Sequence, residues 1–268
     1  AEQVEQISDL PASQVGLSSG LRQVESLQGK GTQRSSNTRR AEPSDQSHIL
    51  PVEQTAALLP GGAAAIAAWK PLWDAGHRTF KWKIATAPVA RELGELEMLI
   101  KALPPDAKLR LDANGGLSLT QAEQYLTVCD RLGIEFLEQP LPPQAVAPLQ
   151  QLSQRYQTPI ALDESVATCA AIEHWQDQGW TGLFVVKPAI AGHFVRLLKT
   201  CQPCRDRIVV SSVFETAVGR QTVLDFAQAL YQDYEPPALG MGTDRWFKAD
   251  GLHQPPFETI WNRLSCHN

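Results

Sequence analysis

Between residues 109 and 165 the sequence repeats one pattern three times, in the segments LRLDAN (109–114), FLEQP (136–140) and ALDES (161–165). Each segment is a short apolar run that contains an acid near its end, and an amphipathic stretch of helical period separates it from the next. This alternation is typical of a parallel sheet with crossover helices. Because the carboxyl ends of parallel barrel strands meet on one side, we expect Asp112, Glu138 and Asp163 to converge.

The same rhythm continues beyond this stretch and predicts a barrel. Successive strand starts fall roughly 25 to 30 residues apart, the size of one βα unit in an eight-fold barrel. A continuous apolar run such as 183–186 also fits a strand that is buried on both faces. We expect strands at 79–84, 109–114, 135–139, 160–164, 183–187, 208–214 and 238–241, with an eighth at 48–52. We expect helices at 89–102, 119–132, 145–155, 168–178 and 191–200.

Composition excludes several classes of function. The chain has 268 residues, of which 43% are hydrophobic, and a formal net charge of -5. These values allow a large core and argue against a sequence-independent nucleic-acid binder, which needs a basic face. The longest apolar run, 63–69, is far shorter than the roughly 20 residues of a membrane span. A small anionic substrate is still allowed, because local charge decides its binding, and we expect a cytoplasmic protein that binds neither membrane nor nucleic acid.

The two ends of the chain and the cysteines add little to this picture. The chain begins Ala1-Glu2-Gln3 without a Met or a basic-then-apolar leader, which indicates a fragment or a trimmed product rather than a secreted precursor. Five cysteines in a chain of this length do not form a disulfide framework. Cys201-Gln-Pro-Cys204 has the spacing of a redox pair, but plain loop cysteines are the favoured interpretation.

The three acids carry the strongest chemical signal. Convergent carboxylates repel one another unless a cation lies between them, and oxygen ligands with open positions suit Mg²⁺, with Mn²⁺ as an alternative. Each acid alone is more simply a helix N-cap or a strand-end ion pair. Three acids at the ends of consecutive strands nevertheless favour a metal site at Asp112, Glu138 and Asp163.

Three lysines are candidates for moving a proton. Lys81 and Lys83 lie two residues apart on one expected strand, so their side chains share a face. If that face lines the barrel mouth, each ammonium lowers the pKa of the other and brings a lysine toward use as a general base. Lys187 ends a strand on the far side of the mouth. The alternatives are solvated lysines on an edge strand and a structural ion pair between Lys187 and one of the acids.

One ordered set of motifs resembles the muconate-lactonizing subgroup of the enolase superfamily: Lys81-Trp-Lys83, Asp112-Ala-Asn114, Glu138-Gln-Pro140, Asp163-Glu-Ser165 and Lys187-Pro188. The resemblance runs from about residue 58 to residue 242. It implies that the three acids bind Mg²⁺ and that Asn114 assists near the metal. It implies that Lys83 abstracts a proton α to a carboxylate, that Lys81 tunes that base, and that Lys187 faces the other side of the substrate.

Two segments discriminate among the reactions of this subgroup. Dipeptide epimerases usually end the eighth strand with Asp-x-Asp, which holds a substrate ammonium, whereas this chain has Gly240-Met-Gly242. The run Ser211-Ser-Val-Phe-Glu215 resembles the Ser-Ser-x-x-Glu segment of o-succinylbenzoate synthases. This likeness implies that Ser211, Ser212 and backbone near Gly240 contact the succinyl or carboxylate end of the substrate. The alternative is that the serines only satisfy backbone groups at the strand ends.

The resemblance also suggests how the chain is divided into domains. In the superfamily an N-terminal α+β capping domain closes the site, and residues 1–46, with a helical stripe over 9–27 and a polar loop over 29–45, resemble its last part. We expect this capping-domain remnant, a (β/α) barrel of TIM type over 47–243, and a segment over 244–268 that packs back on the barrel or the cap.

The implied activity is that of a Mg²⁺-dependent carbon–oxygen lyase. The substrate would be 2-succinyl-6-hydroxy-2,4-cyclohexadiene-1-carboxylate, dehydrated with syn stereochemistry to o-succinylbenzoate in menaquinone or phylloquinone biosynthesis. The nearest alternative is an N-acylamino acid racemase, or another racemase or cycloisomerase of the superfamily, with Lys83 and Lys187 as opposed bases. A Schiff-base barrel with Lys187 as nucleophile and an inactive metal-binding barrel fragment are the remaining alternatives.

Overall fold

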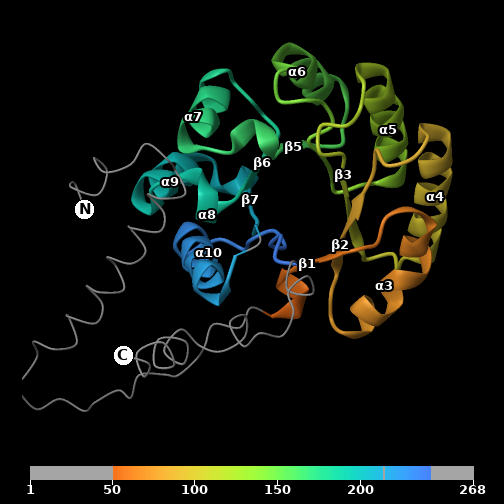
Figure 1. Ribbon diagram of the computed structural model, residues 1–268, viewed down its shortest axis with the longest axis horizontal. Helices are drawn as coiled ribbons and strands as arrows, with labels where there is room; N and C mark the ends of the chain where they lie inside the picture. Colours follow the sequence, from red (N-terminus) through yellow and green to blue (C-terminus); the bar gives the residue numbers. More distant parts are fainter. Residues whose placement is uncertain (1–50, 214, 243–268) are drawn as a thin grey trace, which may run out of the picture.

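The computed structural model describes residues 51–213 and 215–242, which form a curved parallel sheet ringed by helices (Figure 1). Seven strands follow one another around the sheet in sequence order, and each pairs in parallel with the next. The strands are β1 (Ala56–Leu58), β2 (Thr79–Lys83), β3 (Lys108–Asp112), β4 (Phe136–Glu138), β5 (Ile160–Leu162), β6 (Leu183–Val186) and β7 (Ile208–Val210). The predicted α/β barrel is confirmed.

Helices connect the strands and lie outside the ring (Figure 1). They are α3 (Ala65–Asp74), α4 (Val89–Ala102), α5 (Leu119–Leu132), α6 (Val146–Arg155), α7 (Cys169–Asp177), α8 (Pro188–Ala191), α9 (Phe194–Cys201) and α10 (Ala217–Leu230). Short 3-10 turns also occur: η1 (Val52–Gln54), η2 (Gly62–Ala64), η3 (Glu164–Val166) and η4 (Gln202–Arg207). None of the helices in the described part of the chain is long and apolar enough to cross a membrane.

The gap between β7 and β1 is closed by two residues rather than by a full strand. Leu239 bridges to Thr55 beside β1, and Gly240 bridges to Ser211 beside β7, both in parallel. The Leu239 carbonyl accepts from the Ala56 amide at 2.9 Å, and the Gly240 carbonyl accepts from the Ser212 amide at 2.9 Å. The predicted strand at 238–241 is therefore present only as these two bridges, and it still completes the ring.

Two sequence predictions about the elements were wrong. The strand expected at 48–52 does not include Pro51 and Val52, because Val52 begins a 3-10 turn and the first described strand is β1, whereas residues 48–50 lie outside the described residues. Its three residues, Ala-Ala-Leu, are not β-branched, so sequence propensity gave little sign of it. The single helix expected at 191–200 is two helices, α8 and α9, because Gly192 takes a φ of 131°, which no helix accommodates.

Alternation along the strands separates an outer core from an inner layer. Outward side chains such as Leu111, Leu137 and Val186 pack under the helices in one large buried cluster. Inward side chains form a second, smaller cluster across the inside of the barrel, made of Phe136, Ala161, Val185 and Val209. The next inward position along each of these strands reaches the carboxyl end of the barrel. The predicted site residues occupy these positions.

Several predictions concern residues that the structure does not describe. The capping-domain helix at 9–27, the polar loop at 29–45 and the terminal segment at 244–268 lie outside the described residues. The same holds for residue 214, the last position of the predicted seventh strand.

Candidate active site

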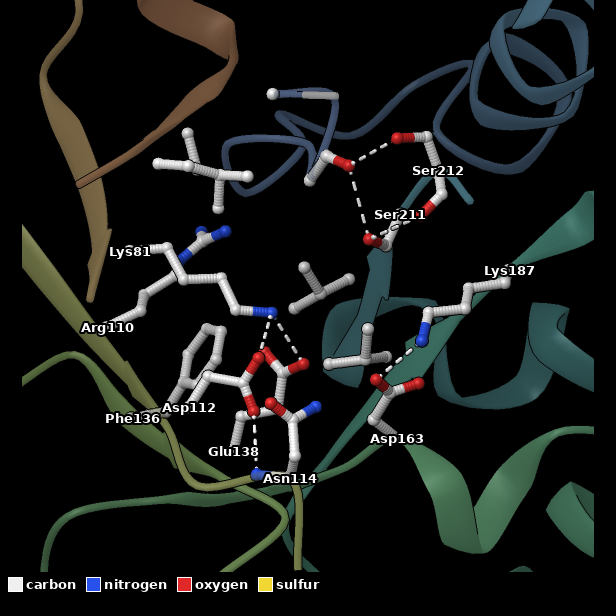
Figure 2. A pocket seen from close by; sticks show the side chains of 16 residues that line it. Lys81, Arg110, Asp112, Asn114, Phe136, Glu138, Asp163, Lys187, Ser211 and Ser212 are labelled. Carbon is white, nitrogen blue, oxygen red and sulfur yellow. Dashed lines mark hydrogen bonds and ion pairs between the residues drawn. The ribbon is translucent and has the colours of Figure 1, made fainter. Parts of the chain in front are cut away.

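A cavity of about 140 Å³ lies at the carboxyl ends of the strands, and the predicted site residues gather around it (Figure 2). Nine of the ten predicted residues line the cavity: Lys81, Asp112, Asn114, Glu138, Asp163, Lys187, Ser211, Ser212 and Gly240. They come from strand ends all around the ring and from the closing bridge. The remaining one, Lys83, does not line it.

The three acids are held by the geometry of the barrel itself. Asp112 and Glu138 are direct register partners on β3 and β4, and Asp163 follows the end of β5. Their exposed fractions are 6%, 1% and 5%, so all three carboxylates are removed from bulk water. Burial raises the pKa of Glu138, and the negative charges of Asp112 and Asp163 raise it further. That mutual repulsion shows that the three acids lie within electrostatic reach of one another.

Lys81 provides the positive charge between two of the acids. Its ammonium lies 2.9 Å from Asp112 Oδ2 and 2.7 Å from Glu138 Oε1. Burial lowers the pKa of Lys81, but the charges of Glu138 and Asp112 outweigh that effect and raise the pKa above its ordinary value. The prediction that neighbouring ammonium groups would lower this pKa was wrong for Lys81. Two carboxylates in direct contact act on it more strongly than a second lysine.

Lys187 lies on the other side of the acids and pairs with the third. Its Nζ donates to Asp163 Oδ2 at 2.6 Å, and a quarter of its side chain, 25%, stays exposed. Figure 2 shows Lys81 and Lys187 on opposite sides of the carboxylates, both with the ammonium turned inward. The predicted placement of Lys187 across the mouth from the lysine pair agrees with this arrangement. The ion pair weighed as its alternative is also present.

Lys83 stands at the rim of the same mouth. It is in register with Asp112 on the neighbouring strand, and it follows Lys81 by two residues, so its side chain leaves β2 on the inner side of the barrel. The residue is exposed, whereas Lys81 below it is half-buried. Lys83 is therefore closer to solvent than Lys81 on the same face of β2.

The chemistry of the donor set suits a hard divalent cation. Three buried carboxylates face two ammonium groups, which leaves an excess of negative oxygen donors in the cavity. Within the described ranges, however, no group of three or more His, Cys, Asp or Glu side chains is arranged as a metal cage. The ion pairs of the lysines explain this: Lys81 lies between Asp112 and Glu138, and Lys187 is paired with Asp163. The metal ligands stay a prediction.

Asn114 lies just beyond the first acid and joins two strand ends. Its backbone takes a φ of 44°, and its amide N–H donates to Asp112 Oδ1 at 3.0 Å. Its side-chain Nδ2 donates to Glu164 Oε1 at 2.9 Å, beside Asp163. Asn tolerates this left-handed conformation better than most residues. The side chain thus braces the loops that carry two of the acids.

Ser211 and Ser212 turn toward the closing bridge. The Ser211 and Ser212 hydroxyls donate to the Gly240 carbonyl at 3.2 Å and 3.0 Å. A Cβ atom on Gly240 would lie 2.4 Å from Ser211 Oγ and 2.9 Å from Ser211 Cβ, so any larger residue there would displace Ser211. The backbone-satisfying role weighed as an alternative is therefore real, and it does not exclude a substrate contact because each hydroxyl oxygen can still accept.

The cavity also contains residues that the sequence reasoning missed. Arg110 is 1% exposed and lines the cavity from β3, where its Nε donates to Glu135 Oε2 at 2.6 Å. Its Nη1 donates to the Ala238 carbonyl at 2.7 Å and so ties β3 to the closing segment, and its guanidinium lies over the Phe136 ring. The available signal was the position of Arg110, two residues before Asp112 and therefore on the same inward face of β3.

The cysteine pair proposed as a redox alternative has no features of a reactive site. Cys201 and Cys204 are buried, and both are free thiols. Burial raises the pKa of each thiol, most strongly that of Cys201. A buried thiol with a raised pKa is a poor nucleophile, so the pair fits the structural interpretation.

The chain is similar in sequence to a known family of proteins. Residues 64–239 match the model of the family described as "Enolase C-terminal domain-like". An o-succinylbenzoate synthase of Thermosynechococcus vestitus is 41% identical over 217 residues, covering 78% of this chain and 66% of the relative. An N-succinylamino acid racemase of Amycolatopsis sp. is 29% identical over 148 residues, covering 54% of this chain and 39% of that protein.

A solved structure gives the same result in three dimensions. The crystal structure of o-succinylbenzoate synthase from Thermosynechococcus elongatus BP-1, described as complexed with Mg in the active site, superposes with a TM-score of 0.78 at 36% identity. That match covers 98% of this chain and 78% of the solved chain. In the sequence comparison, the matched region spans about two thirds of the length of the Thermosynechococcus vestitus relative.

Proposed function

We propose that this chain, which belongs to the enolase C-terminal domain-like family of the enolase superfamily, acts as an o-succinylbenzoate synthase. The reaction is the Mg²⁺-dependent syn dehydration of 2-succinyl-6-hydroxy-2,4-cyclohexadiene-1-carboxylate to o-succinylbenzoate. We assign it to menaquinone or phylloquinone biosynthesis in the cytoplasm. The similarity to the synthases of Thermosynechococcus supports this choice among the reactions of the superfamily.

One observation carries the proposal: three buried carboxylates lie between lysines that approach from β2 and from the end of β6. Lys81 and Lys187 contact the acids from opposite sides, and Lys83 stands at the rim above Lys81. A carboxylate substrate in this mouth would meet ammonium groups on both faces. That is the arrangement needed to remove a proton next to a carboxylate and to stabilise the anion that results.

Lys83 and Lys187 divide the proton chemistry between them. The Lys83 Nζ takes the proton from the carbon next to the substrate carboxylate. The bond between the ring and its hydroxyl then breaks, and the ammonium of Lys83 returns the proton to the departing oxygen, which leaves as water. Both steps occur on one face of the ring, which gives the syn outcome. Lys187 holds positive charge on the opposite face throughout.

The other residues bind and orient. Asp112, Glu138 and Asp163 would hold the cation, which supplies positive charge for the substrate carboxylate when it is bound. The apolar layer of Phe136, Val185 and Val209 lines the cavity and suits the carbocyclic ring. Ser211 and Ser212, on the far wall, are placed for the succinyl end.

An absorbance assay tests the proposal directly. The full chain is mixed with Mg²⁺ and the cyclohexadiene substrate, and formation of the aromatic product is followed in the ultraviolet. We expect turnover that a chelator abolishes and that added Mg²⁺ restores. A chain that binds Mg²⁺ and stays folded but forms no aromatic product would refute the proposed activity.

The arrangement of two opposed lysines also favours one second candidate. Racemisation of an N-acylamino acid needs a base on each face of the substrate, and Lys83 and Lys187 could serve in turn. Exchange of the α-hydrogen with deuterium from the solvent, measured on an N-succinylamino acid by NMR, distinguishes this reaction. Exchange with inversion, in the absence of dehydration of the cyclohexadiene, would replace the first proposal with the second.

A further inference from the structure

Gln139 directly follows the second acid, and the proposed chemistry does not use it. The residue is fully buried, at 0% exposed, and its backbone takes a φ of 35°, in the left-handed region that Gln rarely adopts. Such strain persists only where the surroundings fix it, and it gathers at functional sites.

Every polar atom of the Gln139 side chain is bonded. Its Oε1 accepts the backbone N–H of Asp163 at 3.0 Å and that of Ser165 at 3.1 Å. Its Nε2 donates to the Leu141 carbonyl at 2.8 Å and to Ser165 Oγ at 2.8 Å. The amide thus uses two acceptor sites and both donor hydrogens, which is its full capacity. A buried network satisfied to this degree specifies one geometry.

The backbone of Gln139 extends the same connection to both neighbouring strands. Its N–H donates to the Ala161 carbonyl on β5 at 2.8 Å, and its carbonyl accepts from Gly115 at 2.7 Å, in the loop after β3. Gln139 is thus connected to all three acids. It follows Glu138 in the chain, and it is hydrogen-bonded to Gly115 in the loop after Asp112 and to the amide of Asp163. Among these acids, Asp163 depends most on it, since its own amide is bonded to the Gln139 side chain.

We propose that Gln139 is a positioning residue that sets Asp163 relative to Glu138 and Asp112, and thereby sets the affinity of the cavity for a divalent cation. This inference rests on the proposed function, in which the three acids are the ligands. Residues that orient metal ligands without touching the metal typically change affinity about 10- to 100-fold when they are replaced. No other side chain can replace the amide, because Glu lacks the two donors, Asn is too short, and Met or Leu has neither donors nor acceptors.

Titration with Mn²⁺ alone, without substrate, measures the effect independently of turnover. The variant is Gln139→Met, which keeps the side-chain volume and removes all four hydrogen bonds of the amide. We expect its Mn²⁺ dissociation constant, from isothermal calorimetry, to be at least about tenfold higher than that of the unmodified chain. Ser165→Ala removes one of the four bonds and should give a smaller increase.

The matched control is Gln176→Met on α7. Gln176 is half-buried and also bonds through its amide, donating to the Thr200 carbonyl at 2.9 Å and to Cys204 Sγ at 3.0 Å, but it lies outside the cavity. This variant should lower the unfolding temperature and leave the Mn²⁺ affinity unchanged. Equal loss of affinity in Gln139→Met and Gln176→Met would mean a general loss of stability, and it would overturn the inference.

Three further outcomes are decisive. If Gln139→Met binds Mn²⁺ as tightly as the unmodified chain, the inference is wrong and the proposed function stands. If the unmodified chain binds neither Mn²⁺ nor Mg²⁺, both the inference about Gln139 and the proposed function are wrong. If Gln139→Met does not fold, hydrogen exchange on the unmodified chain decides: we expect slow exchange of the Asp163 and Ser165 amides, and rapid exchange there would refute the inference.

Discussion

At the scale of single residues, the cavity is organised by the way two ammonium groups are shared among three buried carboxylates. A buried carboxylate without a cationic partner is costly, and removing one partner of a buried pair destabilises a protein by about 3–5 kcal/mol. Lys81 serves two acids and Lys187 serves one. Lys83 is left exposed at the rim, so it is the lysine that can approach a substrate without breaking an ion pair.

Replacement of Lys83 or Lys187 by Ala should reduce turnover of the cyclohexadiene by about 100- to 10,000-fold, the usual contribution of a positioned acid or base. The two variants should differ in stability, because Lys187 pairs with buried Asp163 and Lys83 is exposed. Steady-state kinetics and thermal unfolding measure both effects. Lys101→Ala, at an exposed position on α4, is the control, and undiminished turnover in Lys83→Ala would contradict the assignment.

Gly240→Ala should damage the far wall of the cavity. The added methyl would lie 2.4 Å from Ser211 Oγ and 2.9 Å from Ser211 Cβ, so the serine must move. We expect a loss of about 1–3 kcal/mol in the free energy of unfolding, together with a raised KM. Gly94→Ala is the matched control, because nothing lies within 4 Å of its Cβ position on α4. It should stabilise the chain by about 0.5–1 kcal/mol, and an unchanged KM in Gly240→Ala would argue against a substrate contact at this wall.

At the scale of secondary-structure elements, the loop after β2 is fixed by one buried carboxylate. Glu92, in the first turn of α4, accepts the backbone N–H groups of Ala85, Thr86 and Ala87 at 2.8–3.0 Å. It also accepts the Tyr125 hydroxyl. Ala85 takes a φ of 63°, only two residues after Lys83, so Glu92 determines how the loop leaves the strand that carries the proposed base.

The Glu92→Gln variant should show this role through pH. Burial raises the pKa of Glu92, but hydrogen bonds from Tyr125, Thr86 and Ala85 outweigh burial and lower it below its ordinary value. The carboxylate therefore stabilises the fold fully above the ordinary carboxyl pKa, and that stabilisation is lost as the pH falls through the lowered pKa. We expect Glu92→Gln to cost about 2–3 kcal/mol at neutral pH.

Urea unfolding of both chains at a series of pH values measures the difference. The gap between them should shrink as the solution becomes acidic, because the unmodified Glu92 is then protonated too. Tyr125→Phe removes a single donor and should cost less than Glu92→Gln. A gap that does not change with pH would show that the charge of Glu92 is not what holds the loop.

The elements that sequence predicts well are those with local stop signals. The bounds of α5 match the prediction because Ser118 caps it in a capping box with Gln121, and Gly133 ends it in the left-handed conformation. The closing bridge had no such signal, since it consists of two paired residues whose partners lie far away in sequence. Gly192 breaks a helix that an apolar pattern alone would continue.

The sequence predicts which residues form the site better than it predicts the contacts between them. A period of two along a strand places Lys81 and Lys83 on one face, and convergence of strand ends brings the acids together. Which lysine binds which acid depends on side-chain reach and burial, which the sequence does not encode locally. The roles of Arg110 and Gln139 were missed for the same reason, because their partners come from distant strands.

At the scale of the whole molecule, the residues of the hydrophobic core and the residues of the candidate site lie in different parts of the barrel. The large outer cluster under the helices and the small inner layer carry the packing, while the polar residues gather at the carboxyl ends of the strands. This division lets one scaffold support different reactions, so fold alone cannot select the substrate. The choice among superfamily reactions rests on Ser211, Ser212 and Gly240 of the far wall and on similarity to the synthases.

The most direct test of the central claim is to locate a bound cation in crystals of this chain grown with Mn²⁺, using its anomalous scattering. We predict one strong peak enclosed by the carboxylates of Asp112, Glu138 and Asp163, with the ammonium groups of Lys81 and Lys187 moved away from the acids. A Mn²⁺ peak elsewhere on the barrel, with both lysines still paired to these acids, would contradict the claim.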